Sequence, residues 1–229
     1  MVLTDGSGHT GVSRLPSTAA LLQESGATPG SLFGRLTDAQ LYRELLDHNT
    51  TLACDIADEI AAAVVRSNIR IVVADDAEGY NPTHDVCRLI VDAAVSIAQV
   101  RCRSPIVNLA FALMERPDRI ARPGEATSSQ FLLDDEALQR KLEAAARYPE
   151  MASEVAAARE AWGDAAFRVE TFRHVEEDTA WAPGDEPPFY ERHGEGRVAT
   201  GLYADVIRYD RHIRPIAVAL AAHMRRPTP

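Results

Sequence analysis

Apolar positions in the first half of the chain alternate between strand-like runs and helix-like stripes. Short apolar runs occupy residues 1–5, 69–74 and 105–114. Between them, leucine and isoleucine recur at helical spacing over residues 41–66, and a second stripe covers residues 86–100. Short β-branched runs are typical of strands, and recurrence at three and four residues is typical of amphipathic helices. The pattern predicts strand, helix, strand, helix, strand, the alternation of an α/β protein with a parallel sheet.

The segments between these elements are also interpretable. Residues 6–34 are rich in Gly, Ser, Thr and Pro, which predicts a long loop with about one helical turn at residues 18–24. Thr37 or Asp38 is expected to cap a single long helix that continues to Arg66. The strand at residues 69–74 is so uniformly apolar that both of its faces are expected to be buried.

The second half of the chain has a different pattern. Residues 134–148 and 150–162 are rich in Ala, Glu and Arg and are predicted to be helices, with a strand at residues 168–175. The segment AWAPGDEPPFYERHGEG, residues 180–196, is predicted to be a loop. A closing helix is expected over about residues 200–224.

These elements predict one domain in the α/β fold class, with a Rossmann-like, doubly wound, mostly parallel sheet and a helical C-terminal part. Residues 1–115 would form the sheet core with the site loop. Residues 116–229 would form a mostly helical extension, and the whole chain, residues 1–229, would be a single domain.

Charge and composition narrow the choice of partners. The net charge is −10, so nucleic acid and anionic membrane surfaces are poor candidate partners. No run approaches the 18–20 or so apolar residues of a membrane span. The chain also lacks a basic start followed by an apolar stretch, which favours a cytoplasmic location.

The candidate chemistry lies in EGYNPTHD, residues 78–85, between the second strand and the second helical stripe. In parallel sheets, the loop at the carboxyl end of a strand opens onto the ligand crevice. Pro82 suits the first position of a helix, which would place His84 in the first helical turn. The helix dipole there favours a neutral imidazole that can bind a metal. A polar helix start with a capping network is the alternative. Glu78 and Tyr80 are candidate substrate-binding residues in the same loop.

IRIVVADDAEGYNPTHD resembles the second metal motif of the LmbE-like, or PIG-L, family of zinc-dependent de-N-acetylases. In that family a strand ends in a Gly-containing loop, and His-Pro-Asp-His then opens a helix. The resemblance, aligned on Pro82, implies that His84 is a zinc ligand. It also implies that Asn81, in place of the first histidine, donates a hydrogen bond to the oxyanion. MVLTDGSG and RLTDAQLYRELLDHNTTLACDIADEIAAAVV are similar to the family's second strand and to its helical region, so the resemblance covers about half the chain.

The resemblance implies a hydrolase that removes an acetyl group from an N-acylated amine, such as an N-acetylated amino sugar, by zinc-activated water. The family's His-Pro-Asp-Asp-Glu motif, which supplies two zinc ligands and the base, does not occur in the sequence. The zinc ligand set is therefore incomplete, and three explanations stay open. A strand and helix are missing from the N-terminus, or a partner chain in a homo-oligomer completes the site, or the chemistry has been lost. The last case implies a non-catalytic small-molecule-binding or assembly protein.

Other residues are weaker candidates, each with a structural or solvated alternative. His193 could close over a sugar-like or polyol substrate from its predicted loop. Arg14 could bind an anionic substrate group, and Asp5 could hydrogen-bond substrate hydroxyls or form an Asx turn. His9 and the histidine and carboxylates of residues 173–177 could supply metal ligands, although a solvated loop and a surface strand end are the favoured interpretations.

Overall fold

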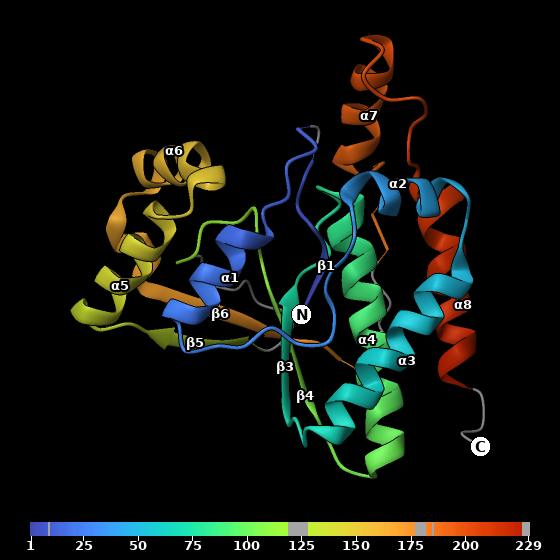
Figure 1. Ribbon diagram of the computed structural model, residues 1–229, viewed down its shortest axis with the longest axis horizontal. Coiled ribbons are helices and arrows are strands. Elements are labelled where there is room, and N and C mark those ends of the chain that lie inside the picture. The colour runs from blue at the N-terminus through green and yellow to red at the C-terminus, as the bar shows by residue number, and fades with distance from the viewer. Residues whose placement is uncertain (9, 119–127, 177–181, 185, 226–229) are drawn as a thin grey trace. The chain divides into compact units, whose positions relative to one another are not determined.

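The computed structural model describes residues 1–8, 10–118, 128–176, 182–184 and 186–225 (Figure 1). In this part of the chain the protein is mixed α/β, with small and mostly parallel sheets. The chain forms two compact units, and each is assembled from two stretches of sequence. Unit 1 combines Met1–Ala39 with Glu115–Arg173, and unit 2 combines Gln40–Met114 with His174–Pro229.

Unit 2 contains the predicted strand–helix–strand element. Strands β3 (Ile71–Asp75) and β4 (Val107–Phe111) run parallel, with Ile71 opposite Val107 and Asp75 opposite Phe111. Helix α4 (Pro82–Cys102) connects them and packs against β3. Because Asn81 caps this helix and Pro82 occupies its first turn, its start is confirmed where the sequence predicted it.

Three helices make the core of unit 2. Helices α3 (Thr50–Arg66), α4 and α8 (Arg214–Met224) pack against one another, as Figure 1 shows. Their small and branched apolar side chains form the contact surfaces, which explains the helical spacing in the sequence. The deeply buried side chains of these helices include Ile56, Ala57, Ala61, Ile90, Ala94, Ala98, Ile216 and Leu220.

The prediction of one long helix up to Arg66 is wrong. Helix α2 (Asp38–Leu46) ends before α3 begins, and His48 between them has a φ of 55°. Asn49 then caps α3 by accepting a hydrogen bond from the backbone N–H of Leu52 at 3.0 Å. The His48 ring stacks on the buried ring of His212, with centroids 5.1 Å apart. A left-handed residue followed by an Asn cap ends one helix and starts the next.

The strand β3 is not buried on both faces as predicted. Ile71 and Val73 are 58% and 45% exposed, whereas Val72 and Ala74 between them are partly buried. This alternation is the period of two that follows from the pleat of a strand.

The C-terminal stretch of unit 2 also differs from its prediction. The segment predicted to be a loop overlaps helix α7 (Phe189–Ala199), so His193 lies on a helix. The closing helix α8 starts at Arg214, after a π-helical turn (Tyr209–Ile213), and not near residue 200. The two prolines at 187 and 188 precede α7 directly, and proline is common at a helix start.

Unit 1 holds two strand pairs. Strands β1 (Val2–Thr4) and β2 (Phe33–Leu36) pair in parallel, and β5 (Ser128–Leu132) pairs with β6 (Val169–His174) antiparallel. The strands β1 and β6 were predicted, and β2 and β5 were not. Gly34 in β2 has a φ of 68°, and a Cβ there would lie 2.1 Å from the Leu15 side chain. Only glycine fits this position without displacing Leu15.

The helices of unit 1 are short. Helix α1 (Leu15–Glu24) has ten residues, so it begins earlier than the single turn predicted at residues 18–24. Helices α5 (Asp135–Ala146) and α6 (Ala152–Trp162) confirm the two predicted helices. The remaining turns are 3-10 helices at Pro149–Met151 and Asp164–Arg168. Arg147 pairs with Glu24 at 2.9 Å and so connects the end of α5 to α1.

Among the described residues, no helix is both long enough and apolar enough to cross a membrane. The 21-residue helix α4 has the length, but Asp85, Arg88 and Asp92 interrupt its apolar sequence.

Candidate functional site

The candidate site lies in unit 2, where β3 ends and α4 begins. Asn81 has extended backbone dihedrals, and its side-chain oxygen accepts hydrogen bonds from the Thr83 N–H at 3.0 Å and the Thr83 hydroxyl at 2.8 Å. No described residue accepts a hydrogen bond from the Asn81 amide nitrogen. The cap therefore uses the oxygen of Asn81 and leaves its donor group for a ligand.

His84 is held by a carboxylate from the end of β3. Its Nδ1 forms a short hydrogen bond with Oδ2 of Asp75. This bond raises the pKa of His84 above its usual value and outweighs the opposing effect of burial, and negative charge on Asp75, Asp85 and Glu78 adds to the rise. No described residue hydrogen-bonds Nε2, and the side chain is 39% exposed. A histidine oriented by a carboxylate with its other nitrogen accessible can transfer a proton.

Asp85 is the most buried acid of this turn, with only 1% of its surface exposed. Its Oδ1 accepts hydrogen bonds from the backbone N–H groups of Glu78 at 3.1 Å and Gly79 at 3.2 Å. Its Oδ2 has no described hydrogen-bond partner. Burial raises the pKa of Asp85 to about 6, even though the two N–H groups act in the opposite direction. Asp85 therefore holds the site loop, a role that the sequence analysis did not assign to it.

Glu78 connects the ends of the two strands. Its carboxylate accepts hydrogen bonds from the backbone N–H groups of Leu113, at 2.7 Å, and Met114, at 3.3 Å. These bonds tie the loop after β3 to the segment after β4. Substrate binding by Glu78 stays a prediction beside this structural role.

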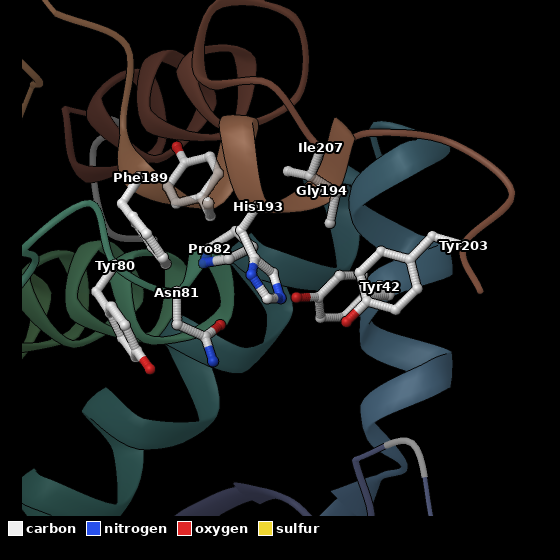
Figure 2. Close-up of a pocket in the computed structure, with 10 residues that line it drawn as sticks. Tyr42, Tyr80, Asn81, Pro82, Phe189, His193, Gly194, Tyr203 and Ile207 are labelled. Atoms are coloured by element: carbon white, nitrogen blue, oxygen red, sulfur yellow. The ribbon is translucent and has the colours of Figure 1, made fainter. Parts of the chain in front are cut away.

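A pocket of about 130 Å³ lies against this loop, and Figure 2 shows its walls. On one side the Tyr80 and Phe189 rings stack with centroids 5.5 Å apart, and on the other Tyr42 and Tyr203 lie 5.9 Å apart. His193 lies between the two pairs and stacks on Phe189 at 5.8 Å. This volume is smaller than the roughly 300–1,000 Å³ of typical ligand pockets, so the pocket would hold no more than a small molecule or one ring of a larger one. The other residues that line the pocket are Asn81, Pro82, Tyr190, Gly194 and Ile207.

The structure thus brings together three predicted residues, Tyr80, Asn81 and His193, on one pocket. His84 is three residues beyond Asn81 in the first turn of α4, but it is not among the residues that line the pocket. The sequence did not point to Tyr42, Phe189, Tyr190 or Tyr203. Nothing in their spacing marks them, because they come from three separate segments of the chain.

Asp5 and Arg14 belong to unit 1. The Asp5 Oδ1 accepts hydrogen bonds from the N–H and hydroxyl of Ser7, at 3.0 and 2.6 Å, and from the Asp38 N–H at 3.3 Å. Burial raises the pKa of Asp5, but these hydrogen bonds outweigh it and the net pKa is lowered. Arg14 packs along Gly6 and points its guanidinium at the Met151 sulfur, 3.6 Å away.

The described residues supply only part of the ligand set that the predicted zinc site needs. His84 Nε2 is an available ligand, and a carboxylate on its other nitrogen is the usual support of a zinc-bound histidine. However, no three His, Cys, Asp or Glu side chains gather as a metal site within the described ranges. Zinc needs at least three protein ligands, so the described residues do not fit a zinc site. His9 and Glu177, two candidates for further ligands, lie outside the described residues.

No family model, curated protein or solved structure matches this chain.

Proposed function

We propose that unit 2 binds a small, uncharged N-acylated amine and hydrolyses the amide bond to its acyl group, with His84 as the proton-transfer residue. The observation that carries this proposal is the Asp75–His84 pair, in which Asp75 holds Nδ1 and leaves Nε2 without a described partner. The Asn81 amide, three residues earlier at the start of the same helix, adds a hydrogen-bond donor.

The proposed hydrolysis uses a water molecule and the side chains of His84 and Asn81. Nε2 of neutral His84 takes a proton from water as the water oxygen bonds to the amide carbon of the substrate. The Asn81 N–H donates to the oxygen on which negative charge develops. The C–N bond then breaks as His84 returns the proton to the leaving nitrogen, which yields a carboxylic acid and an amine. Because His84 must be neutral to act as base, the rate should rise with pH through its raised pKa.

The fold and the pocket support the same proposal. A parallel β3–α4–β4 unit with a polar loop at the carboxyl end of β3 is the local arrangement of a Rossmann-like sheet, as in the LmbE-like family that the sequence resembles. Among the described residues, the pocket walls carry aromatic rings, one histidine and one amide, with no Asp, Glu, Lys or Arg. Such walls favour an uncharged ring, and an N-acetylated amino sugar meets that description.

The second candidate is small-molecule binding without turnover. It is favoured by the incomplete metal-ligand set among the described residues and by the position of His84 outside the pocket lining. A cytoplasmic location and self-association of the chain are predictions of the sequence that accompany either candidate.

Acetate release from N-acetyl-D-glucosamine, measured across pH 5.5–8.5 with the full chain, tests the proposal. We expect release that rises with pH and falls by about 10²-fold or more in His84→Gln. Asn81→Asp keeps the helix cap but removes the amide donor, and we expect a loss of about 10- to 100-fold.

His223→Gln serves as the matched control, since His223 of α8 pairs with Asp58 of α3 and is absent from the residues that line the pocket. Equal rates in wild type and His84→Gln would contradict the hydrolase. Saturable binding of the sugar without acetate release would support the second candidate. Repeating the assay with added Zn²⁺ shows whether a metal increases the rate.

A further inference from the structure

Three rings of the pocket wall form a row, which Figure 2 shows. Tyr80 stacks on Phe189 with centroids 5.5 Å apart, and Phe189 stacks on His193 with centroids 5.8 Å apart. All three residues line the pocket and all three are exposed, with 44% of Tyr80 and 48% of Phe189 accessible to solvent. Aromatic rings that stack on one another and stay open to solvent form an apolar wall that a ligand can cover.

Helical geometry and one backbone hydrogen bond position this row. Phe189 and His193 are four residues apart in α7, so their side chains lie on the same face of the helix. The N–H of Tyr190 donates to the carbonyl of Gly79 at 3.3 Å, which connects the start of α7 to the loop that carries Tyr80. These two constraints place the rings of Tyr80 and His193 on either side of Phe189.

His193 is the polar member of the row. Figure 2 shows its imidazole directed from α7 into the space between Asn81 and Tyr42. No described residue forms a hydrogen bond or an ion pair with this imidazole, which stacks on Phe189. A neutral imidazole carries one N–H donor and one acceptor nitrogen, and a sugar hydroxyl can both accept and donate. His193 therefore offers a ligand hydroxyl either kind of hydrogen bond at one end of the row.

The rest of the lining restricts the class of ligand. Among the described residues, the lining includes no Asp, Glu, Lys or Arg, so no charged side chain is in place to pair with a phosphate or a carboxylate. The Asn81 amide adds a hydrogen-bond donor to the same wall. An apolar wall with hydrogen-bonding groups beside it matches a pyranose ring, which presents C–H groups on its faces and hydroxyls around its edge.

We propose that the Tyr80–Phe189–His193 row is a binding subsite for an uncharged pyranose ring. Tyr80 and Phe189 cover C–H groups of the sugar ring, and His193 hydrogen-bonds one of its hydroxyls. The inference rests on the proposed function of unit 2 as the binder of a sugar-like ligand, but it requires no hydrolysis. It makes His193 a specificity-determining residue, because a ring without hydroxyls gains no hydrogen bond from the imidazole nitrogens. Recognition of the ring is thereby separate from the reaction at the acyl group, which the proposed function assigns to His84 and Asn81.

Two variants separate the hydrogen bonding of His193 from its stacking. His193→Phe keeps a ring to stack on Phe189 and removes both nitrogens, whereas His193→Gln removes the ring and keeps a donor and an acceptor. Binding to the full chain is measured by ligand-observed NMR with N-acetyl-D-glucosamine and N-cyclohexylacetamide, which share the acetamide and differ in ring hydroxyls. We expect His193→Phe to weaken binding of the sugar about 5- to 10-fold and binding of N-cyclohexylacetamide by less than about twofold. His193→Gln should bind the sugar within about threefold of wild type.

Phe189→Leu tests the apolar part of the subsite. Leucine keeps an apolar side chain but removes the ring, so both probes should bind about 3- to 10-fold more weakly, and unchanged binding would overturn this part. Arg192→Gln is the matched control for His193→Gln. Arg192 is the neighbouring exposed residue of α7 and does not line the pocket, so both affinities should stay unchanged. Because His193 is exposed, its variants should also unfold within about 3 °C of wild type, which separates recognition from a structural role.

The outcomes distinguish this inference from the hydrolase. Equal affinities of wild type and His193→Phe for N-acetyl-D-glucosamine overturn the inference, as does an equal loss for both probes, and acetate release by wild type would still support the hydrolase. Weaker binding of the sugar alone in His193→Phe, without acetate release from wild type, supports the inference and contradicts the hydrolase. Failure of wild type to bind N-acetyl-D-glucosamine at about 100 mM overturns the inference.

Discussion

The loop between β1 and α1 and the loop between β3 and α4 both follow the carboxyl end of a strand, and they differ in how their polar groups are hydrogen-bonded. In unit 1, the described polar groups of the loop between β1 and α1 are paired, since Asp5 accepts from Ser7 and from Asp38 at the start of α2, and the Asp38 carboxylate accepts from the Gly8 N–H. In unit 2, the end of the loop after β3 and the first turn of α4 leave an oxygen of Asp85 and nitrogen atoms of Asn81 and His84 without a described partner.

The difference separates a structural turn from a candidate binding site. Both loops are rich in the residues that sequence reasoning selects for chemistry. A carboxylate that already accepts three hydrogen bonds, such as Asp5, gains little free energy from a hydrogen bond to a ligand. A buried oxygen without a partner gains much more from such a bond. The contrast favours the β3–α4 loop as the place of the proposed ligand chemistry and a structural role for the β1–α1 loop.

The largest expected effect comes from Asp85. Its pKa rises from about 4 in the unfolded chain to about 6 in the folded protein, so the folded state binds the proton more tightly. The stability that this group contributes is present below about pH 4 and is lost as the pH rises through about 6. The linkage amounts to a loss on the order of 3 kcal/mol between pH 4 and pH 7.

Asp85→Asn removes this titration and keeps an acceptor for the N–H groups of Glu78 and Gly79. The free energy of unfolding of the variant minus that of wild type should increase by that amount from pH 4 to pH 7, as measured by urea unfolding. A difference that does not change with pH would show that Asp85 is paired and would remove the contrast between the loops. Asp85→Ala should be less stable than Asp85→Asn at both pH values by about 2 kcal/mol, because two N–H groups lose their acceptor.

A smaller effect is expected from Asp5. Asp5→Ala leaves the Ser7 and Asp38 N–H groups without their acceptor, and we expect unit 1 to lose about 1–2 kcal/mol in urea unfolding. Asp5→Asn, which retains the acceptor oxygen, should lose less than half of that. Weaker binding of N-acetyl-D-glucosamine by Asp5→Asn would contradict the structural assignment and restore Asp5 as a substrate-binding residue.

The smallest expected change is local to His84. Asp75→Asn removes the carboxylate that raises the pKa of His84, so this pKa should fall toward or below that of a free histidine. An NMR titration of the imidazole carbon-bound protons measures it, with the His84 signals assigned from their absence in His84→Gln. An unchanged pKa would mean that the Asp75–His84 hydrogen bond does not form in solution.

Local sequence predicted the start of α4 well. Pro82 at the helix start and His84 in the first turn were both predicted from residues within a few positions of one another, and the structure adds Asn81 as the cap. The break between α2 and α3 was missed for a different reason. Apolar spacing continues in phase from Leu45 to Leu52, and periodicity records which side faces the core, not whether the helix is continuous.

The sequence alone determined the mixed α/β alternation, the acidic balance of the chain and the polar turn after β3, because each depends on composition or on neighbouring residues. Only the tertiary structure decided that Asp75 holds His84, that Asp85 is buried with one oxygen unpaired, and that α7 brings Tyr190 and His193 to the Asn81 turn. These pairings join residues that are up to about a hundred positions apart, and long-range packing, which no local pattern encodes, selects them.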